Sequence, residues 1–166
     1  LYGADGERFL DCYNNVPCVG HCHPRVVEAL CKQAGTLNTH TRYLNENILD
    51  YGEALLAKFD DSLDRVALAC TGSEANDLAL RIARCNTGGD GFICTNATYH
   101  GNTTAVSQFT SIYDPIGGRD DNIRLVPWPD SYRPIADVPE EELADIYADE
   151  VRKAIESLEQ AGIKLA

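Results

Sequence analysis

Apolar side chains recur every three or four positions in several parts of the chain, which is the spacing of a buried helix face. A helix is predicted over residues 24–35, opened by Pro24 and ended by Gly35. The same spacing predicts helices over residues 46–59, 75–85 and 140–161. The buried side of the 46–59 helix is expected to carry Ile48, Leu49, Leu55 and Leu56.

Short apolar runs without helical spacing separate these helices. They predict strands at residues 65–70, 92–95 and 123–126, and a further strand that begins at residue 163 after a glycine cap. The first run is apolar enough to be buried on both faces of a sheet. Because strands alternate with helices, the chain is assigned to the α/β class, with a mostly parallel sheet covered by helices. The sheet is expected to be incomplete, since its last strand stops at residue 166.

The first residues follow a different pattern. Asp5-Gly6 is a turn pair that tolerates positive φ, and Phe9, Leu10 and Cys12 supply apolar positions after it. Residues 1–12 are therefore predicted to form a short hairpin.

The charge balance excludes several classes of partner. The 166 residues carry a net charge of -12, and such a surface repels nucleic acid and anionic lipid. No stretch reaches the roughly 18 to 20 apolar residues that a membrane helix needs. We therefore expect a protein that binds neither nucleic acid nor membrane. The sequence contains no Met, so we expect it to be an excerpt of a longer polypeptide.

The cysteines indicate a reducing compartment rather than a disulfide framework. There are 7 of them, an odd number scattered through apolar segments, so buried reduced thiols in a cytoplasmic protein are expected. Cys18, His21, Cys22 and His23 lie close enough together to suggest metal ligands. Tetrahedral zinc sites usually draw ligand pairs from separated segments, and no second pair is evident. We predict no metal site, because a turn leading into the first helix explains these residues.

The turn Cys70-Thr71-Gly72-Ser73-Glu74-Ala75-Asn76 joins a predicted strand to a predicted helix. Gly72 lets the backbone approach a ligand, and the free amides at a helix start favour an anion. The turn therefore has the features of a phosphate site. It is equally an ordinary helix cap, in which the Ser73 hydroxyl accepts from the amide of Asn76. It is not a nucleotide P-loop, since the Gly-Lys-Ser/Thr ending is missing.

A second candidate stretch, Thr98-Tyr99-His100-Gly101-Asn102, follows the strand predicted at residues 92–95. Ligands of open parallel sheets bind outside the carboxyl ends of strands, so this stretch and Gly72 are expected to face the same crevice. An aromatic ring there could lie flat against a planar cofactor. The alternative is a packed tyrosine beside a solvated imidazole.

These stretches resemble a known family. GHCHPRVVEAL (residues 20–30), CTGSEANDLALRIAR (70–84) and TYHGNT (98–103) are similar, in this order, to the signature of class-III aminotransferases, pyridoxal-phosphate enzymes of fold type I. The similarity covers the whole chain. It is closest to the branch of phospho-lyases acting on ethanolamine phosphate and phosphohydroxylysine, because DCYNNVPCVGHCHP, LNTHTRYLNENILDY, PDSYR and ADEVRKAIE are also similar to that branch.

The resemblance implies pyridoxal 5'-phosphate as the cofactor and assigns its contacts. Gly72 and Ser73 match the phosphate-binding turn of the family. Tyr99 matches the aromatic residue that stacks on the pyridine ring, and His100 is its neighbour in the same motif. These four residues are the predicted cofactor site.

The resemblance also implies a domain organisation. Residues 1–45 match the amino-terminal segment that helps to form the small domain, with Arg42 and Tyr43 as candidate substrate contacts. Residues 46–166 match the first part of the large, cofactor-binding domain. The family completes its active site across a dimer interface, so a homodimer is implied for the intact enzyme.

The chain departs from the family in its reactive groups. The chemistry needs a lysine that holds the cofactor as a Schiff base and an acidic residue beside the pyridine nitrogen. None of the lysines lies in a segment like the lysine motif of the family, and the acidic residue is expected beyond residue 166. No catalytic residue is therefore predicted, and this chain alone is expected to be inactive. The lysines are Lys32, Lys58, Lys153 and Lys164.

The function expected is that of the amino-terminal portion of a class-III aminotransferase, which moves an amino group from an amine or amino acid to a keto or aldehyde acceptor. Two alternatives remain open. One is a phospho-lyase that eliminates phosphate from a phosphorylated amino alcohol. The other is a non-catalytic binding or dimerisation module, which the missing lysine favours if these 166 residues are the whole product.

Overall fold

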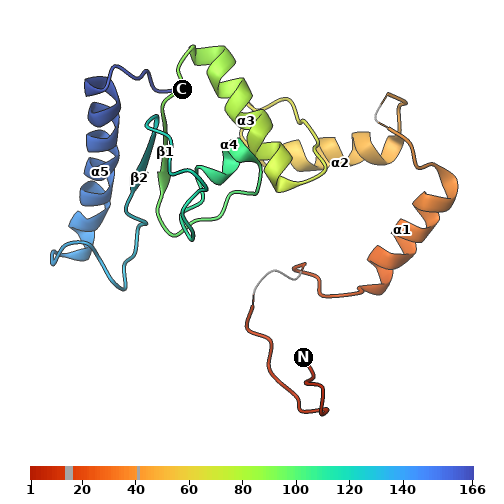
Figure 1. Ribbon diagram of the computed structural model, residues 1–166. Helices are drawn as coiled ribbons and strands as arrows, with labels where there is room; N and C mark the ends of the chain where they lie inside the picture. The colour runs from red at the N-terminus through yellow and green to blue at the C-terminus, as the bar shows by residue number, and fades with distance from the viewer. Residues whose placement is uncertain (14–16, 41) are drawn as a thin grey trace. The chain divides into compact units, whose positions relative to one another are not determined.

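The computed structural model describes residues 1–13, 17–40 and 42–166. It divides the chain into two compact units, Leu1–Val66 and Ala67–Ala166 (Figure 1). Each unit is described by itself below. Within the described ranges, no helix combines the length and the apolar character that crossing a membrane requires.

The first unit contains two of the predicted helices. Helix α1 spans Pro24–Thr36, with the proline in its first turn as predicted. Gly35 lies inside this helix rather than ending it, because the intrahelical pattern continues to the Leu37 amide, which donates to Gln33 O at 3.0 Å. Helix α2 spans Glu46–Leu56 and ends three positions before the predicted end, in a turn. The side chain of Asn45 starts α2 by accepting from the amide of Asn47 at 3.0 Å.

The predicted hairpin is present as one antiparallel bridge between Tyr2 and Arg8. Gly6 has φ 84 in the turn between them, as the Asp5-Gly6 pair predicted. The apolar side chains after the turn are exposed, Leu10 by 88%. A hairpin held by a single bridge has no second layer to bury them against.

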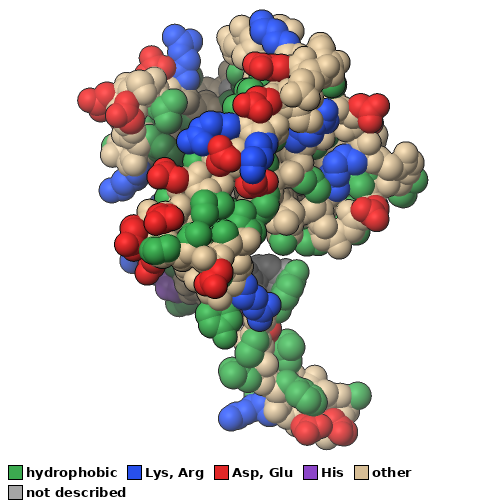
Figure 2. Space-filling view, turned by 90° about the vertical axis from the view of Figure 1, so that its left-hand side faces the viewer, with side chains coloured by type: hydrophobic (Ala, Val, Ile, Leu, Met, Phe, Trp, Pro, Cys, Tyr) green, Lys and Arg blue, Asp and Glu red, His purple; other side chains and the backbone are tan. Residues whose placement is uncertain are grey.

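The first unit has almost no core of its own. Among its described residues only Gly52 is buried. Ile48 and Leu49, expected on the buried side of α2, are 37% and 50% exposed. Hydrophobic side chains also reach the surface between charged ones on the face shown in Figure 2. Two helices and one bridge provide too few layers to cover the apolar face of either helix.

The second unit is built on the predicted parallel sheet. Strand β1 (Phe92–Thr95) pairs in parallel with β2 (Ile123–Val126), in a register that places Phe92 opposite Ile123. The strand predicted to begin at residue 163 is present as a parallel bridge between Gly91 and Leu165. Gly91 N donates to Lys164 O at 2.8 Å, and Ala166 N donates to Gly91 O at 2.9 Å.

The strand predicted at residues 65–70 is wrong for this structure. No described segment pairs with it, and Val66 and Leu68 are 40% and 49% exposed. An apolar run becomes a strand only where a neighbouring strand accepts and donates its backbone hydrogen bonds, and that neighbour is not among the described residues.

Helices lie on both sides of this sheet, as the α/β assignment predicted (Figure 1). On one side, α3 (Gly72–Thr87) and the short α4 (Thr104–Ser107) flank β1, and the ring of Phe92 meets that of Phe109 edge-on at 5.4 Å. On the other side, α5 (Glu140–Gln160) packs along the strands. Its buried side chains are Leu143, Tyr147, Ala154 and Leu158.

Helix α5 ends as predicted at a glycine. Gly162 has φ 72, and its amide donates to Glu159 O at 2.9 Å. The Ile163 amide then bonds Leu158 O at 2.9 Å, which turns the chain back toward the sheet.

The hydroxyl of Tyr147 anchors the loop that leads into α5. It donates to Asp130 O at 3.1 Å and accepts from the amides of Asp130 at 3.1 Å and Ile135 at 3.4 Å, on a side chain only 9% exposed. Tyr147→Phe removes these bonds, so we expect the free energy of unfolding to fall by about 1 to 3 kcal/mol. Denaturant titration measures it. Tyr132→Phe is the matched control, since this tyrosine is 85% exposed, and equal stability of the two variants would contradict the assignment.

Candidate functional site

Helix α3 begins at a cap that satisfies part of its first turn. The N-cap is Thr71, whose hydroxyl accepts from the amide of Glu74 at 3.1 Å. The carboxylate of Glu74 accepts from the amide of Cys70 at 2.8 Å, close to a capping box. The alternative in which the Ser73 hydroxyl caps Asn76 is therefore wrong, because Thr71, two positions earlier, provides the cap.

The backbone amides that this cap does not bond point out of the start of helix α3. Those of Thr71, Gly72 and Ser73 have no acceptor among the residues that the structure describes. The space beside Gly72 is open, with nothing within 4 Å of a Cβ built there. Unpaired amides and the positive end of the helix dipole together favour an anion at this position.

The loop after β1 lies directly against this turn. Asn102 N donates to the hydroxyl of Ser73 at 3.1 Å, and the Asn76 side chain donates to His100 O at 2.7 Å. At Gly101, with φ 137, an added Cβ would lie 2.5 Å from Ser73 Oγ and 2.8 Å from Ser73 Cα. The two candidate stretches are therefore in direct contact, and the expectation that they face one ligand crevice stays a prediction.

Tyr99 and His100, neighbours in this loop, have opposite environments. Tyr99 is 55% exposed, whereas His100 is half-buried with its ring edge-on to Phe109 at 6.3 Å. His100 Nδ1 lies 3.1 Å from Phe109 O, and because a carbonyl only accepts, this nitrogen carries the hydrogen. The alternative of a packed tyrosine beside a solvated imidazole is therefore wrong, because here the tyrosine is exposed and the imidazole is packed.

The floor below the loop is apolar and neutral. An open hollow of about 230 Å³ lies there between α3 and the rings of Phe92 and Phe109. Burial raises the pKa of the nearby Cys94 thiol, an effect that the positive charge of Arg119 partly opposes. The raised pKa favours the neutral thiol of Cys94 over the more nucleophilic thiolate.

Sequence reasoning missed several residues that shape this site. Thr71 carries a readable signal, because threonine three positions before glutamate is a capping pattern. Asn76 and Asn102 lie within the candidate stretches, but their contacts join segments far apart in sequence. The close packing of Gly101 on Ser73 has no signal in the sequence beyond the presence of glycine.

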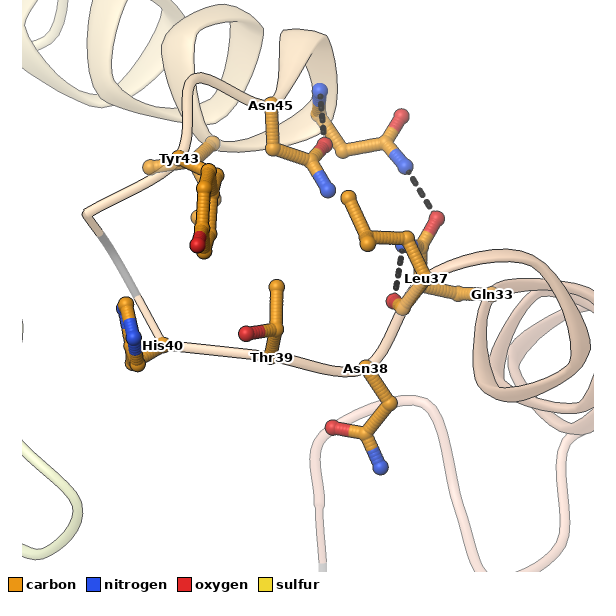
Figure 3. Close-up of a pocket in the computed structure, with 9 residues that line it drawn as sticks. Gln33, Leu37, Asn38, Thr39, His40, Tyr43 and Asn45 are labelled. Carbon is orange, nitrogen blue, oxygen red and sulfur yellow. Dashed lines mark hydrogen bonds between the residues drawn. The ribbon is translucent and has the colours of Figure 1, made fainter.

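The candidate substrate residues Arg42 and Tyr43 belong to the first unit. Tyr43 is 63% exposed and stacks on His40, with ring centroids 5.3 Å apart. The Arg42 amide donates to His40 Nδ1 at 3.2 Å. Tyr43 and His40 form one wall of a hollow of about 230 Å³ between the end of α1 and the start of α2, opposite Leu37 (Figure 3).

The cysteine and histidine cluster before α1 is a turn. Cys22 has φ 54, and its sulfur lies 3.3 Å from His21 Nε2. His23 is the N-cap residue of α1. Within residues 1–13, 17–40 and 42–166, no group of three or more metal-ligating side chains occurs.

Comparison with known proteins identifies one matching family and several similar proteins. The family described as Aminotransferase class-III matches residues 1–162. The chain is 37% identical over 135 residues to a Drosophila melanogaster protein named alanine--glyoxylate aminotransferase 2-like, covering 80% of this chain and 27% of that protein. It is 34% identical over 177 residues to ethanolamine-phosphate phospho-lyase homolog 1 of Caenorhabditis elegans, covering 98% of this chain and 38% of that protein.

A solved structure is similar over nearly the whole chain. It is a phospholyase from Arthrobacter in complex with phosphoethanolamine, with 42% sequence identity and a TM-score of 0.81, and the match covers 97% of this chain and 38% of that one. The chain thus spans less than two fifths of the length of each of these relatives.

Proposed function

Because the chain belongs to the class-III aminotransferase family and has its fold type I architecture, we propose that it is the amino-terminal portion of an enzyme that uses pyridoxal 5'-phosphate. The enzyme transfers an amino group between an amino donor and a keto or aldehyde acceptor. The observation that carries the proposal is the meeting of the α3 turn with the Tyr99 loop, through the Asn102 to Ser73 bond at 3.1 Å.

The residues at this meeting point fit the phosphate of the cofactor. The amides of Gly72 and Ser73 are free to donate to its oxygens. The Ser73 hydroxyl accepts from Asn102, so its own hydrogen is also available. When bound, the cofactor supplies an electron sink that stabilises negative charge on the substrate carbon. Gly72 and Ser73 would hold its phosphate at the α3 start.

Two further cofactor residues come from the neighbouring loop. Tyr99, 55% exposed, offers its ring to the face of the pyridine. His100 belongs to the same cofactor site, anchored by its bond to Phe109 O. On the substrate side we propose Arg42 and Tyr43.

We propose no catalytic residue within this chain. Lys153 pairs with Asp149 and Glu150, and the ammonium group of Lys164 donates to Thr87 O, so both lie on the surface of the second unit away from the α3 turn. The reactive lysine and the acidic partner of the pyridine nitrogen are assigned to a part of the enzyme outside these residues. This chain alone is therefore proposed to be inactive.

The organisation proposed for the intact enzyme follows the family. Residues 1–45 contribute to the small domain and residues 46–166 form the first part of the large domain. The enzyme is a cytoplasmic homodimer, and its substrates are a small amine or amino acid and a keto acid.

A second candidate activity is elimination of phosphate from a phosphorylated amino alcohol. It is favoured by the 42% identity to the Arthrobacter phospholyase, which covers 97% of this chain. Incubation of the intact enzyme with ethanolamine phosphate separates the two activities. A phospho-lyase releases phosphate and ammonia without a keto acid, whereas a transaminase needs the acceptor.

A non-catalytic module is the third candidate. The free amides at the α3 start and the exposed apolar faces of the first unit suit ligand binding and association without chemistry. The intact mass of the protein from its native source decides this question. A mass near 18.2 kDa, that of this chain, would support the module and contradict the enzyme.

The phosphate site is tested with Ser73→Ala. Loss of one hydrogen bond to a charged ligand removes about 1.5 to 3 kcal/mol, so we expect affinity for both pyridoxal 5'-phosphate and inorganic phosphate to fall by roughly tenfold or more. Calorimetric titration of each ligand measures the change. Ser131→Ala, at an exposed loop position, is the matched control. Unchanged affinity in Ser73→Ala, or no competition between the two ligands, would contradict the site.

A further inference from the structure

The segment that carries Tyr99 is bonded along one side to a second segment. Thr98 N donates to Ser111 Oγ at 2.9 Å, and Ser111 N donates to Thr98 O at 2.8 Å. His100 N donates to the hydroxyl of Thr110 at 3.2 Å, and His100 Nδ1 donates to Phe109 O at 3.1 Å. We refer to residues 98–100 and 109–111, with these bonds, as the clip.

The second segment of the clip is itself held in place. Thr110 is fully buried and Phe109 is 8% exposed. The guanidinium of Arg119 donates to Gln108 O and, at 3.0 Å, to Thr110 O. The side chain of Gln108, 7% exposed, accepts from Asp120 N at 2.9 Å. The clip is thus anchored on a buried, satisfied polar network, which is the kind that rigidifies a structure.

Tyr99 is the one residue of its segment that the clip does not bond. Its neighbours Thr98 and His100 are bonded through both backbone and side chain. The Tyr99 side chain is 55% exposed, and its hydroxyl has no hydrogen-bond partner within the part of the chain that the structure describes. The bonds of Thr98 and His100 hold the backbone on either side of Tyr99, and so the position from which its ring projects.

We infer that the clip is a positioning device, in which Thr98, His100, Thr110 and Ser111 set the ring of Tyr99 for stacking on a planar heterocyclic ligand. This inference rests on the proposed function and deepens it. His100 is on this view a positioning residue, since its Nδ1 hydrogen is committed to Phe109 O. A backbone held in place before binding loses less conformational entropy when the ligand arrives, which strengthens binding without a new contact.

The clip is tested by measuring separately how much ring stacking and phosphate binding contribute to ligand affinity. Pyridoxine 5'-phosphate carries both groups but no aldehyde, and inorganic phosphate carries only one. The ratio of the two affinities measures the contribution of ring stacking. The affinity for inorganic phosphate alone measures binding at the α3 turn. Thr110→Val removes the hydroxyl that accepts from His100 N, so we expect the ratio to fall about three- to tenfold, the range of an aromatic pair, with phosphate affinity retained.

Three further variants control this experiment. Thr110→Ser keeps the hydroxyl and should restore the ratio. Thr104→Val makes the same chemical change at an exposed threonine outside the clip and should leave the ratio unchanged. Ser111→Ala removes the acceptor of Thr98 N at a half-buried position. It should lower the ratio even if Thr110→Val does not fold.

The outcomes separate this inference from the proposed function. A ratio that stays at the unsubstituted value in a folded Thr110→Val and in Ser111→Ala overturns the clip, while the cofactor site stands. An unsubstituted protein that binds neither ligand overturns both. A ratio that falls in both variants and recovers in Thr110→Ser establishes the clip.

Discussion

Gly101→Ala should weaken phosphate binding and destabilise the second unit. The added Cβ would lie 2.5 Å from Ser73 Oγ and 2.8 Å from Ser73 Cα, at a residue with φ 137. Backbone strain and overpacking together cost about 2 to 4 kcal/mol. The site can relieve the contact only by moving the loop away from Ser73, which breaks the Asn102 to Ser73 bond. We expect phosphate affinity to fall by more than about tenfold, measured by calorimetry.

Gly118→Ala separates strain from crowding in this experiment. Gly118 also has positive φ, 91, but nothing lies within 4 Å of a Cβ built there. This variant should lose about 1 kcal/mol of stability through strain alone, with phosphate affinity unchanged. Equal effects of the two substitutions on phosphate binding would show that the close packing of Gly101 on Ser73 is not part of the site.

Gly89→Ala should cause the largest loss of stability away from the site. Gly89 is buried, and an added Cβ would lie 2.6 Å from the carbonyl carbon of Leu165 and 2.8 Å from Lys164 O, still closer to Leu165 O. These atoms are backbone and cannot rotate away. Residues 164–166 must therefore separate from Gly91, at a cost of about 2 to 4 kcal/mol.

Hydrogen exchange shows which part of the protein Gly89→Ala destabilises. The amides of Gly91 and Ala166 bond across the junction at 2.8 and 2.9 Å, so both should exchange faster in Gly89→Ala. Gly35→Ala is the control, because it lies within α1 with nothing within 4 Å of its Cβ. It should stabilise its helix by about 0.5 to 1 kcal/mol. Unchanged protection of Gly91 and Ala166 in Gly89→Ala would contradict the packing described.

Local patterns sufficed for most of the elements. Pro24 at the start of α1, Gly162 after α5 and the apolar runs of β1 and β2 act over a few residues, so periodicity and capping preferences located them. The failures lie where a long-range partner decides the outcome. Residues 65–70 have the composition of a buried strand, yet a strand forms only against a neighbour. The error at Gly35, by contrast, is a local one of a single residue, since α1 ends at Thr36.

The sequence by itself determined the α/β class, the family resemblance and the two stretches at which a cofactor site was sought. Residue types at short spacing carry that information, because an amide-rich helix start and an aromatic loop are local features. The tertiary structure alone decided that Gly101 packs on Ser73, that Thr71 rather than Ser73 caps α3, and that His100 turns inward while Tyr99 stays exposed. The packing of Gly101 on Ser73 and the inward turn of His100 depend on contacts between segments nine or more positions apart, which composition and periodicity do not encode. The choice of Thr71 as the cap is local, but two neighbouring hydroxyl residues could each have filled that role.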